Sequence, residues 1–451
     1  MKKNLEEYEL KRNLKNRHIQ MIAIGGAIGV GLFYGSANAI SIGGPSIILA
    51  YLIGGLFVFM IMRALGELAV DDPNSGSFSA YATKYLGNFA GFFSGWTYWF
   101  QCTTTVMAEL TAVGVYVQFW MPGFPKWISA LIFLSALIVI NLIGVGAYGE
   151  FEFWFAFIKV AAIICMIIFG LLIIIFGFGN GGHAIGFSNL WKNGGFFANG
   201  IRGFLLSFIF VTFAFGGVEL IGITAGEAEE PKKSIPKAIN NVFWRILIFY
   251  VGSIGVMLSL YSWNKIGLKG SPFVLVFDKV GIPAAASIIN FVVLTAALSG
   301  MNSALYVDGR MLYSLALNNN APKMFSKVSK SGIPYVGILF STFIAMIAVI
   351  LNYFLPAKVF DYVSSVTVIA IITAWITILL VQLKFRKYKN SLGEKVDFKM
   401  PFYPFFSYIA IIYLLLIVIS LSFLPSTRIS LYVVPVWIIA LLIMYKLFLK
   451  K

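Results

Sequence analysis

Long apolar stretches separated by short polar segments make up most of this chain. Twelve stretches come close to, or exceed, the roughly 20 residues that cross a bilayer as one α-helix. The pattern therefore predicts an all-α polytopic membrane protein with about twelve transmembrane helices. The predicted spans are residues 18–40, 44–64, 90–119, 127–147, 151–176, 200–224, 243–262, 281–303, 334–353, 358–382, 403–424 and 431–449.

The first of these spans contains an unusual concentration of glycine. Residues 25–31 hold Gly25, Gly26, Gly29 and Gly31, and each glycine costs a helix interior about 0.8–1.0 kcal/mol relative to alanine. A bilayer tolerates broken helical backbone only where the break is buried in protein or lines a cavity. The run therefore predicts a break whose free N–H groups can hold an anion such as a carboxylate, although close helix packing is an alternative.

A second glycine pair interrupts the sixth span. Gly216 and Gly217 lie within residues 212–219, and five spans separate the starts of the two interrupted helices. An odd offset means that the two helices cross the membrane in opposite directions. Paired broken helices in two inverted halves indicate the midplane site of a secondary transporter, so the two clusters together favour a ligand site over simple packing.

Composition and charge agree with a membrane protein whose termini lie inside the cell. Hydrophobic residues make up 59% of the chain and charged residues 12%, and the mean hydropathy is +0.88. Most of the 34 lysines and arginines fall in segments on one side, so the net charge of +16 reports topology and not a nucleic-acid partner. Residues 1–17 are predicted to be a cytoplasmic tail without a cleavable signal peptide.

No pattern in the sequence points to a cofactor, a metal or an enzyme. Cys102 and Cys165 fall inside predicted spans, and His18 and His183 stand apart from other ligand-type side chains. We therefore expect neither a structural disulfide nor a metal site. A nucleophile–base pair is also missing, and the chain shows neither the repeated filter segment nor the charged ring of a channel.

Three ionisable residues lie well inside predicted spans, where each costs about 2.5–3.5 kcal/mol at the helix centre. They are Glu109, Lys159 and Glu219. Lys159 is either a proton-coupling site, because burial disfavours its charged form, or a structural cation that holds carbonyls of the broken first helix.

The other two ionisable residues also have alternatives. Glu109 is either a proton carrier, a hydrogen-bond partner within the bundle or a direct contact of a polar substrate. Glu219 follows the second break, where a carboxylate suits the start of a half-helix, so it has either that structural role or a role in gating or proton transfer. In the eighth span, Ser299 and Asn302 either face the broken first helix or serve helix packing.

Several motifs resemble those of bacterial amino acid permeases of the amino acid–polyamine–organocation superfamily. They span residues 17–35, 43–45, 63–73 and 213–231. Residues 190–197 and 427–432 resemble the proline, histidine and threonine permease branch most closely. The resemblance implies two inverted five-helix repeats, residues 18–176 and 200–382, followed by two peripheral helices in 403–449.

The resemblance also implies the substrate-binding residues. On the first helix these are Ala27, Gly29, Val30 and Gly31, with the substrate carboxylate on amides around Val30 and Gly31 and the α-amine near the Ala27 carbonyl. On the sixth helix they are Phe213, Ala214, Phe215 and Gly216, with carbonyls for the amine and two rings for the side-chain pocket. Val30 is a departure, because many relatives have a hydroxyl residue there.

The implied activity is import of an L-amino acid by proton symport across the plasma membrane, with an exchanger of the same fold as the alternative. Relatives that use protons carry a lysine at the position of Lys159, where sodium-coupled relatives bind a cation between helices 1, 5 and 8. Proline is the first choice of substrate, followed by histidine, threonine and other neutral amino acids. The expected partners are the amino acid, the proton and the lipid bilayer.

Overall fold

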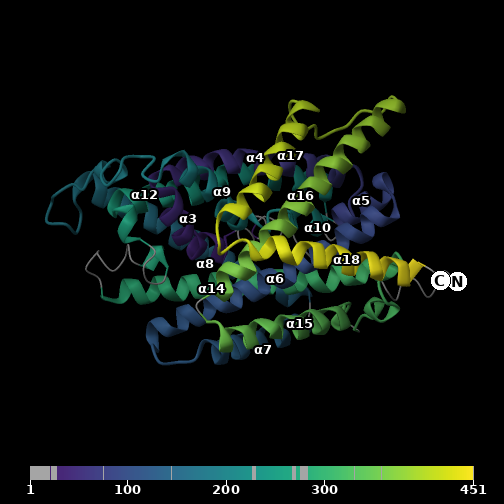
Figure 1. Cartoon of the computed structure of the whole chain (residues 1–451), viewed down its shortest axis with the longest axis horizontal. Helices are drawn as coiled ribbons and strands as arrows, with labels where there is room; N and C mark the ends of the chain where they lie inside the picture. Colours follow the sequence, from purple (N-terminus) through teal and green to yellow (C-terminus); the bar gives the residue numbers. More distant parts are fainter. Residues whose placement is uncertain are drawn as a thin grey trace.

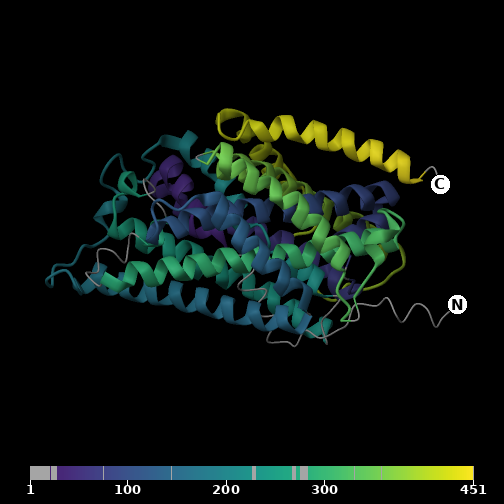
Figure 2. The same ribbon diagram turned by 90° about the horizontal axis from the view of Figure 1, so that it is seen from below.

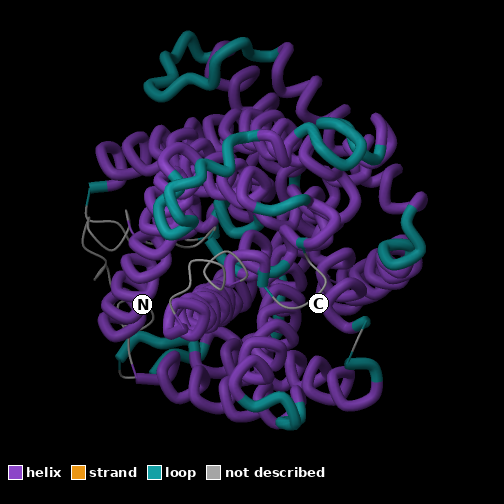
Figure 3. The backbone as a smooth tube through the Cα atoms, turned by 90° about the vertical axis from the view of Figure 1, so that its left-hand side faces the viewer, coloured by secondary structure: helices purple, strands orange, loops and turns teal. Residues whose placement is uncertain are grey.

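The structure is a computed structural model. It describes Met21 and residues 28–74, 76–143, 145–225, 230–266, 271–274, 283–329, 331–356 and 358–449. Throughout these ranges the backbone is helical or forms turns and loops, the longest of them over residues 177–199, and it contains no strand (Figure 3). The predicted all-α fold is confirmed.

The helices follow one another closely along the chain (Figure 1). Their bounds are α2 (Val30–Phe33), α3 (Gly35–Gly43), α4 (Ile47–Asp71), α5 (Ser77–Leu86), α6 (Asn88–Trp120), α7 (Lys126–Ile143), α8 (Val145–Phe176), α9 (Gly200–Phe215), α10 (Leu220–Thr224), α11 (Pro231–Arg245), α12 (Ser253–Leu260), α14 (Pro283–Leu317), α15 (Tyr335–Phe354), α16 (Val359–Ser391), α17 (Phe405–Ser420) and α18 (Ile429–Leu449). A π-helical segment, η6 (Ile246–Gly252), joins α11 to α12.

Nine helices in the described ranges are long and apolar enough to cross a membrane. The first of them is Gly35–Asp71, which comprises α3 and α4, and the last is Ile429–Leu447 in α18. A shorter apolar helix spans Lys126–Leu142. α6 lies at the centre of the bundle, in contact with α5, α7, α14, α15 and α16. The last two helices are mostly exposed, and α18 runs along the outside of the bundle (Figure 2).

Both predicted discontinuities are present. In the sixth predicted span, α9 ends at Phe215 and α10 begins only at Leu220, so residues 216–219 lie outside both helices. In the first span, α2 begins at Val30 after Gly29, whose backbone is extended, and a second irregularity at Tyr34 separates α2 from α3. The part of the glycine run at Gly25, Gly26 and Ala27 lies outside the described residues.

Several helices extend beyond the predicted spans. We predicted that the eighth span would end at residue 303, but α14 continues to Leu317 through Asp308 and Arg310, both of which are buried. α16 likewise continues to Ser391, past the predicted end at residue 382. Both predicted ends came too early, because the buried Asp308, Arg310 and Arg386 belong to helix turns that pack inside the protein.

Candidate binding site at the two helix breaks

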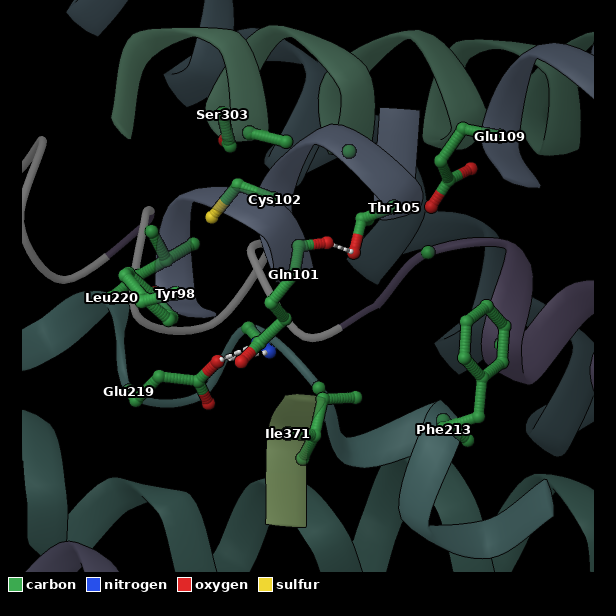
Figure 4. A pocket seen from close by; sticks show the side chains of 17 residues that line it. Tyr98, Gln101, Cys102, Thr105, Glu109, Phe213, Glu219, Leu220, Ser303 and Ile371 are labelled. Atoms are coloured by element: carbon green, nitrogen blue, oxygen red, sulfur yellow. Dashed lines mark hydrogen bonds between the residues drawn. The ribbon is translucent and has the colours of Figure 1, made fainter. Parts of the chain in front are cut away.

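The two breaks meet at a buried cavity of about 50 Å³ near the centre of α6. α2 lies against α9, where a Cβ added to Gly31 would come within 2.5 Å of the Ala214 Cα. Only a glycine at position 31 therefore allows the two broken helices to touch. The cavity is lined by Gly29, Gly31, Tyr98, Gln101, Cys102, Thr105, Glu109, Phe213, Ala214, Gly216, Gly217, Glu219, Leu220, Gly300, Ser303, Ala304 and Ile371 (Figure 4).

Most residues that the resemblance implied for substrate binding come together here. Those that line the cavity are Gly29, Gly31, Phe213, Ala214 and Gly216. The structure places two others elsewhere. The Val30 side chain is buried outside the cavity lining, and the Phe215 ring packs against Tyr51 and Tyr250, at centroid distances of 5.7 and 4.8 Å. Ala27 lies outside the described residues.

The backbone at both breaks already makes defined hydrogen bonds. The Tyr250 hydroxyl donates to the Ala214 carbonyl at 2.9 Å, and the Gly216 N–H donates to the Phe213 carbonyl at 3.1 Å. Because each carbonyl has two lone pairs, these bonds leave acceptor capacity on both oxygens. The break on α9 is thus held in place while it presents carbonyl groups close to the cavity.

Glu109 reaches from α6 to the start of α2. The Val30 N–H donates to the Glu109 Oε1 at 3.3 Å, and the side chain is only 4% exposed. The second carboxylate oxygen, Oε2, is buried without a hydrogen-bond partner among the described residues. Buried polar atoms are nearly always hydrogen-bonded, so an Oε2 without a partner among the described residues sets Glu109 apart from most buried carboxylates.

Lys159 forms a buried cluster between α8 and α14. Its Nζ donates to the Ser299 Oγ at 2.8 Å and lies 3.9 Å from the Glu152 Oε1, and the Ser299 hydroxyl donates to the same carboxylate oxygen at 2.6 Å. All three side chains have no solvent exposure. Lys159 and Ser299 thus face each other, which joins two of the predicted site residues at a position outside the cavity lining.

Glu219 is tied into the second break by three donors. Its Oε1 accepts from the Gln101 amide at 2.5 Å (Figure 4) and from the Gly217 N–H at 3.3 Å. Its Oε2 accepts from the Trp375 indole at 3.2 Å. The carboxylate makes no side-chain cap of α10. It therefore secures the linker between the half-helices instead of the first turn of the second one.

Asn302 lies one turn beyond Ser299 on α14. Its Oδ1 accepts from the Asn141 side chain on α7 at 2.9 Å, while its own Nδ2 is buried without a partner among the described residues. The contact joins α14 to α7 and not to the first helix. The two alternatives for Asn302, packing and a contact with the first helix, stay predictions.

The sequence interpretation missed several buried residues. Glu152 was excluded because it sits at the edge of its predicted span, although it precedes Lys159 by seven residues and so shares its helix face. Asp308 was excluded by the early end of the eighth span, yet it accepts from the Thr103 hydroxyl at 3.1 Å and is fully buried. The lining residues Tyr98, Gln101, Cys102 and Ile371 carried no signal beyond their location in apolar helices.

An all-helical membrane bundle with two discontinuous helices that meet at a buried cavity belongs to the class of secondary transporters. The sequence profile of the amino acid permease family matches residues 18–451. This chain belongs to that family. The coarse prediction from the sequence motifs is therefore confirmed.

Curated relatives cover nearly the whole chain. An uncharacterized amino acid permease of Bacillus subtilis, YtnA, is 52% identical over 98% of this chain and 95% of its own length. The probable threonine/serine transporter YbxG of the same species is 50% identical over the same shares. The aromatic amino acid transport protein AroP of Escherichia coli O6:H1 is 48% identical over 97% of this chain and 95% of its own. The specific proline, histidine and threonine branch is not confirmed.

Proposed function

We propose that this permease imports a neutral L-amino acid by proton symport through alternating access. The observation that carries the proposal is the meeting of the two broken helices, with the main chain at Gly29 and Gly31 and at Phe213, Ala214 and Gly216 around one buried cavity. Such main-chain groups recognise what all L-amino acids share, the carboxylate and the α-amine. Selectivity for one amino acid then comes from the side chains around them.

In this proposal the substrate carboxylate accepts hydrogen bonds from the Val30 and Gly31 amides. The Val30 side chain offers no hydroxyl and is buried away from the cavity lining, so the main chain alone carries this recognition. The α-amine donates to carbonyl oxygens at the α9 break, around Phe213 and Ala214. These oxygens keep acceptor capacity beside their existing bonds.

The remaining lining favours a neutral side chain. Tyr98, Cys102, Phe213, Ala304 and Ile371 present aromatic and apolar surface to the cavity. The Glu219 carboxylate already accepts from three donors, so it offers little to a cationic substrate. Proline remains the first choice from the closer motif resemblance, and the names of the relatives add threonine, serine and aromatic amino acids as competitors.

Lys159 is the proposed proton-coupling residue. Its ammonium lies between α8 and α14 with one carboxylate and one hydroxyl beside it. A desolvated ammonium exchanges its proton more readily than one in water, and loss of that proton would weaken the junction of the two helices. The positive-inside pattern further supports a proposed plasma-membrane topology with both termini in the cytoplasm.

The direct test is uptake of radiolabelled L-proline into proteoliposomes with an inward proton gradient. A competition screen with threonine, serine, phenylalanine and histidine then defines selectivity. We expect saturable uptake that the gradient stimulates, and loss of this stimulation in Lys159→Ala. Lys233→Ala is the matched control, because that lysine is largely exposed. Undiminished stimulation in Lys159→Ala would exclude Lys159 as the coupling site, and counterflow that needs no gradient would favour an exchanger.

A further inference from the structure

The Glu109 carboxylate accepts the hydrogen bond of the Val30 N–H, which the proposed function assigns to the substrate carboxylate. We propose that Glu109 is an internal surrogate for the substrate carboxylate, which the arriving substrate displaces from the Val30 N–H as Glu109 takes up a proton. The inference rests on the proposed function and adds to it the step that links substrate binding to proton binding.

Two glycines, Gly29 and Gly300, leave the space that places the Glu109 carboxylate at the Val30 amide. A Cβ at Gly29 would come within 2.8 Å of the Glu109 Oε1, and a Cβ at Gly300 within 2.6 Å of the same atom. Glycine on both α14 and the first helix therefore leaves the space into which the carboxylate fits. The Val30 N–H then points at Oε1, at an N–O distance of 3.3 Å.

The hydrogen bonds around Glu109 leave room for a proton. Among the described residues, Oε1 accepts only from the Val30 N–H, and the buried Oε2 has no partner. A carboxylic acid would keep its carbonyl oxygen as a weak acceptor and gain an O–H donor. Protonation removes the charge that makes a carboxylate the stronger partner of an N–H group, and so releases the amide to an ionised ligand.

The charged neighbours of Glu109 make displacement and protonation interdependent. From α8, Lys159 is the nearby cation, but its Nζ is already engaged with Ser299 and Glu152. α6 itself contributes Tyr116, and the cavity lining adds the thiol of Cys102 and the carboxylate of Glu219. α2 and α14 contribute the Val30 amide and Gly300. A second ionised carboxylate beside Glu109 would therefore meet a like charge, and the described residues that line the cavity include no lysine or arginine to balance it.

The proposed step conserves atoms and charge. One proton from the aqueous side forms an O–H bond on the Glu109 carboxylate, and the hydrogen bond from the Val30 N–H to Oε1 breaks. The same N–H then donates to the substrate carboxylate, which enters as part of a zwitterion. By linkage, protonation of Glu109 tightens substrate binding, and substrate binding drives proton uptake by the same factor.

The test measures binding and proton uptake together in the purified full-length protein. Calorimetric titrations with L-proline, L-threonine and L-phenylalanine, in two buffers of different ionisation enthalpy, give the affinity and the protons taken up per ligand. The carboxamides of the same amino acids are the matched ligands, because they keep the amine and side chain but lack the anion. Glu109→Gln keeps the shape of the side chain and its acceptor oxygen but cannot take up a proton.

In the wild-type protein we expect net proton uptake with each carboxylate ligand, and an affinity that falls by up to about tenfold per pH unit in the range where Glu109 is ionised in the ligand-free protein. Carboxamides should bind at least about tenfold more weakly and without proton uptake. In Glu109→Gln the carboxylate ligands should still bind, with proton uptake reduced and the pH dependence below about twofold per unit. Thr104→Val, a neutral change on the same helix but outside the cavity lining, should keep the wild-type pH dependence.

Two contrary results are distinguishable. If Glu109→Gln binds an amino acid with wild-type proton uptake and pH dependence, the surrogate role is wrong while the proposed transport function stands. If no amino acid binds even the wild-type protein, the proposed function fails and the surrogate role fails with it. If Glu109→Gln does not fold, the wild-type measurement decides, because carboxylate binding without proton uptake overturns the proposal.

Discussion

Two buried glutamates in this permease have opposite surroundings. Glu67 on α4 accepts from the Arg386 guanidinium through Nε at 2.8 Å and Nη2 at 2.6 Å, from the Gln382 amide at 3.2 Å and from the Met400 N–H. Glu109 on α6 accepts from one backbone N–H and has a buried oxygen without a partner among the described residues. The side chains are 1% and 4% exposed, so burial alone does not separate them.

The difference lies in how completely each carboxylate is satisfied. Glu67 joins α4 to the end of α16 and to the segment before α17, and its bidentate ion pair fixes one geometry. A group held by that many donors is suited to stabilising the fold and poorly suited to exchanging partners. Glu109 has few interactions to lose, so it is suited to taking up a proton and giving up its hydrogen bond with the Val30 amide. Five predictions, in order of expected effect, test this contrast.

The largest effect is expected for Arg386→Met. This change leaves the Glu67 charge buried without its cation, which costs about 3–5 kcal/mol. The apparent melting temperature of the detergent-purified protein should fall strongly, and little protein should elute as a single species. Arg386→Lys keeps the charge and should recover part of the loss. A melting temperature equal to wild type in Arg386→Met would remove the structural role assigned to Glu67.

Trp375→Phe tests the Glu219 carboxylate. With three hydrogen-bond donors, Glu219 lies between the well-satisfied Glu67 and the poorly satisfied Glu109. The indole donates to Oε2 at 3.2 Å, and a hydrogen bond to a charged group contributes about 1.5–3 kcal/mol. We expect a moderate fall in melting temperature together with slower uptake, since the linker at Gly217 loses support. An unchanged melting temperature would mean that this hydrogen bond contributes nothing to the break.

Gly300→Ala tests whether the space for the Glu109 carboxylate is required. The added methyl would come within 2.6 Å of the Glu109 Oε1, and overpacking of this kind costs about 1–3 kcal/mol. Uptake should lose its dependence on the proton gradient, because the carboxylate is pushed away from the Val30 N–H. Gly255→Ala in α12 is the control, as its added Cβ meets nothing within 4 Å. Equal behaviour of the two variants would argue against a tight fit.

Glu109→Gln should affect stability far less than Arg386→Met. The change replaces one hydrogen bond of the carboxylate by that of a neutral amide, so the free energy of unfolding should change by no more than about 0.5–1.5 kcal/mol. Thermal unfolding with amino acid absent measures this directly. A destabilisation as large as that of Arg386→Met would show that Glu109, like Glu67, stabilises the fold.

The smallest effect is expected for Lys84→Ala. Lys84 pairs with Asp72 at 2.8 Å, but both side chains are substantially exposed, and such pairs contribute about 0.2–1 kcal/mol. The hydrogen bond to Asp72 raises the pKa of Lys84 in the folded protein. The pair therefore adds its full contribution to the free energy of unfolding below the pKa that Lys84 has in the unfolded chain, and loses it as the pH rises through the pKa in the folded protein. Melting temperatures at neutral and strongly alkaline pH should therefore differ between wild type and variant only at neutral pH.

Much of the fold follows from local sequence. The glycines at 29, 31, 216 and 217 predicted both breaks, because the cost of glycine in a helix is a local property. The helix ends beyond residues 303 and 382 were not predicted, since Asp308 and Arg386 reach partners on α6 and α4 that are remote in sequence. The partner of Glu109 was missed for the same reason, as 79 residues separate it from Val30.

Infrared difference spectroscopy of the wild-type protein, with and without bound L-amino acid, tests the central claim most directly. If substrate displaces Glu109 and the carboxylate takes up a proton, a carboxylic-acid C=O band should appear on binding and a carboxylate band should disappear. Both changes should be missing in Glu109→Gln, which still binds the amino acid. Binding without a new carboxylic-acid band, or the same band in Glu109→Gln, would contradict the account.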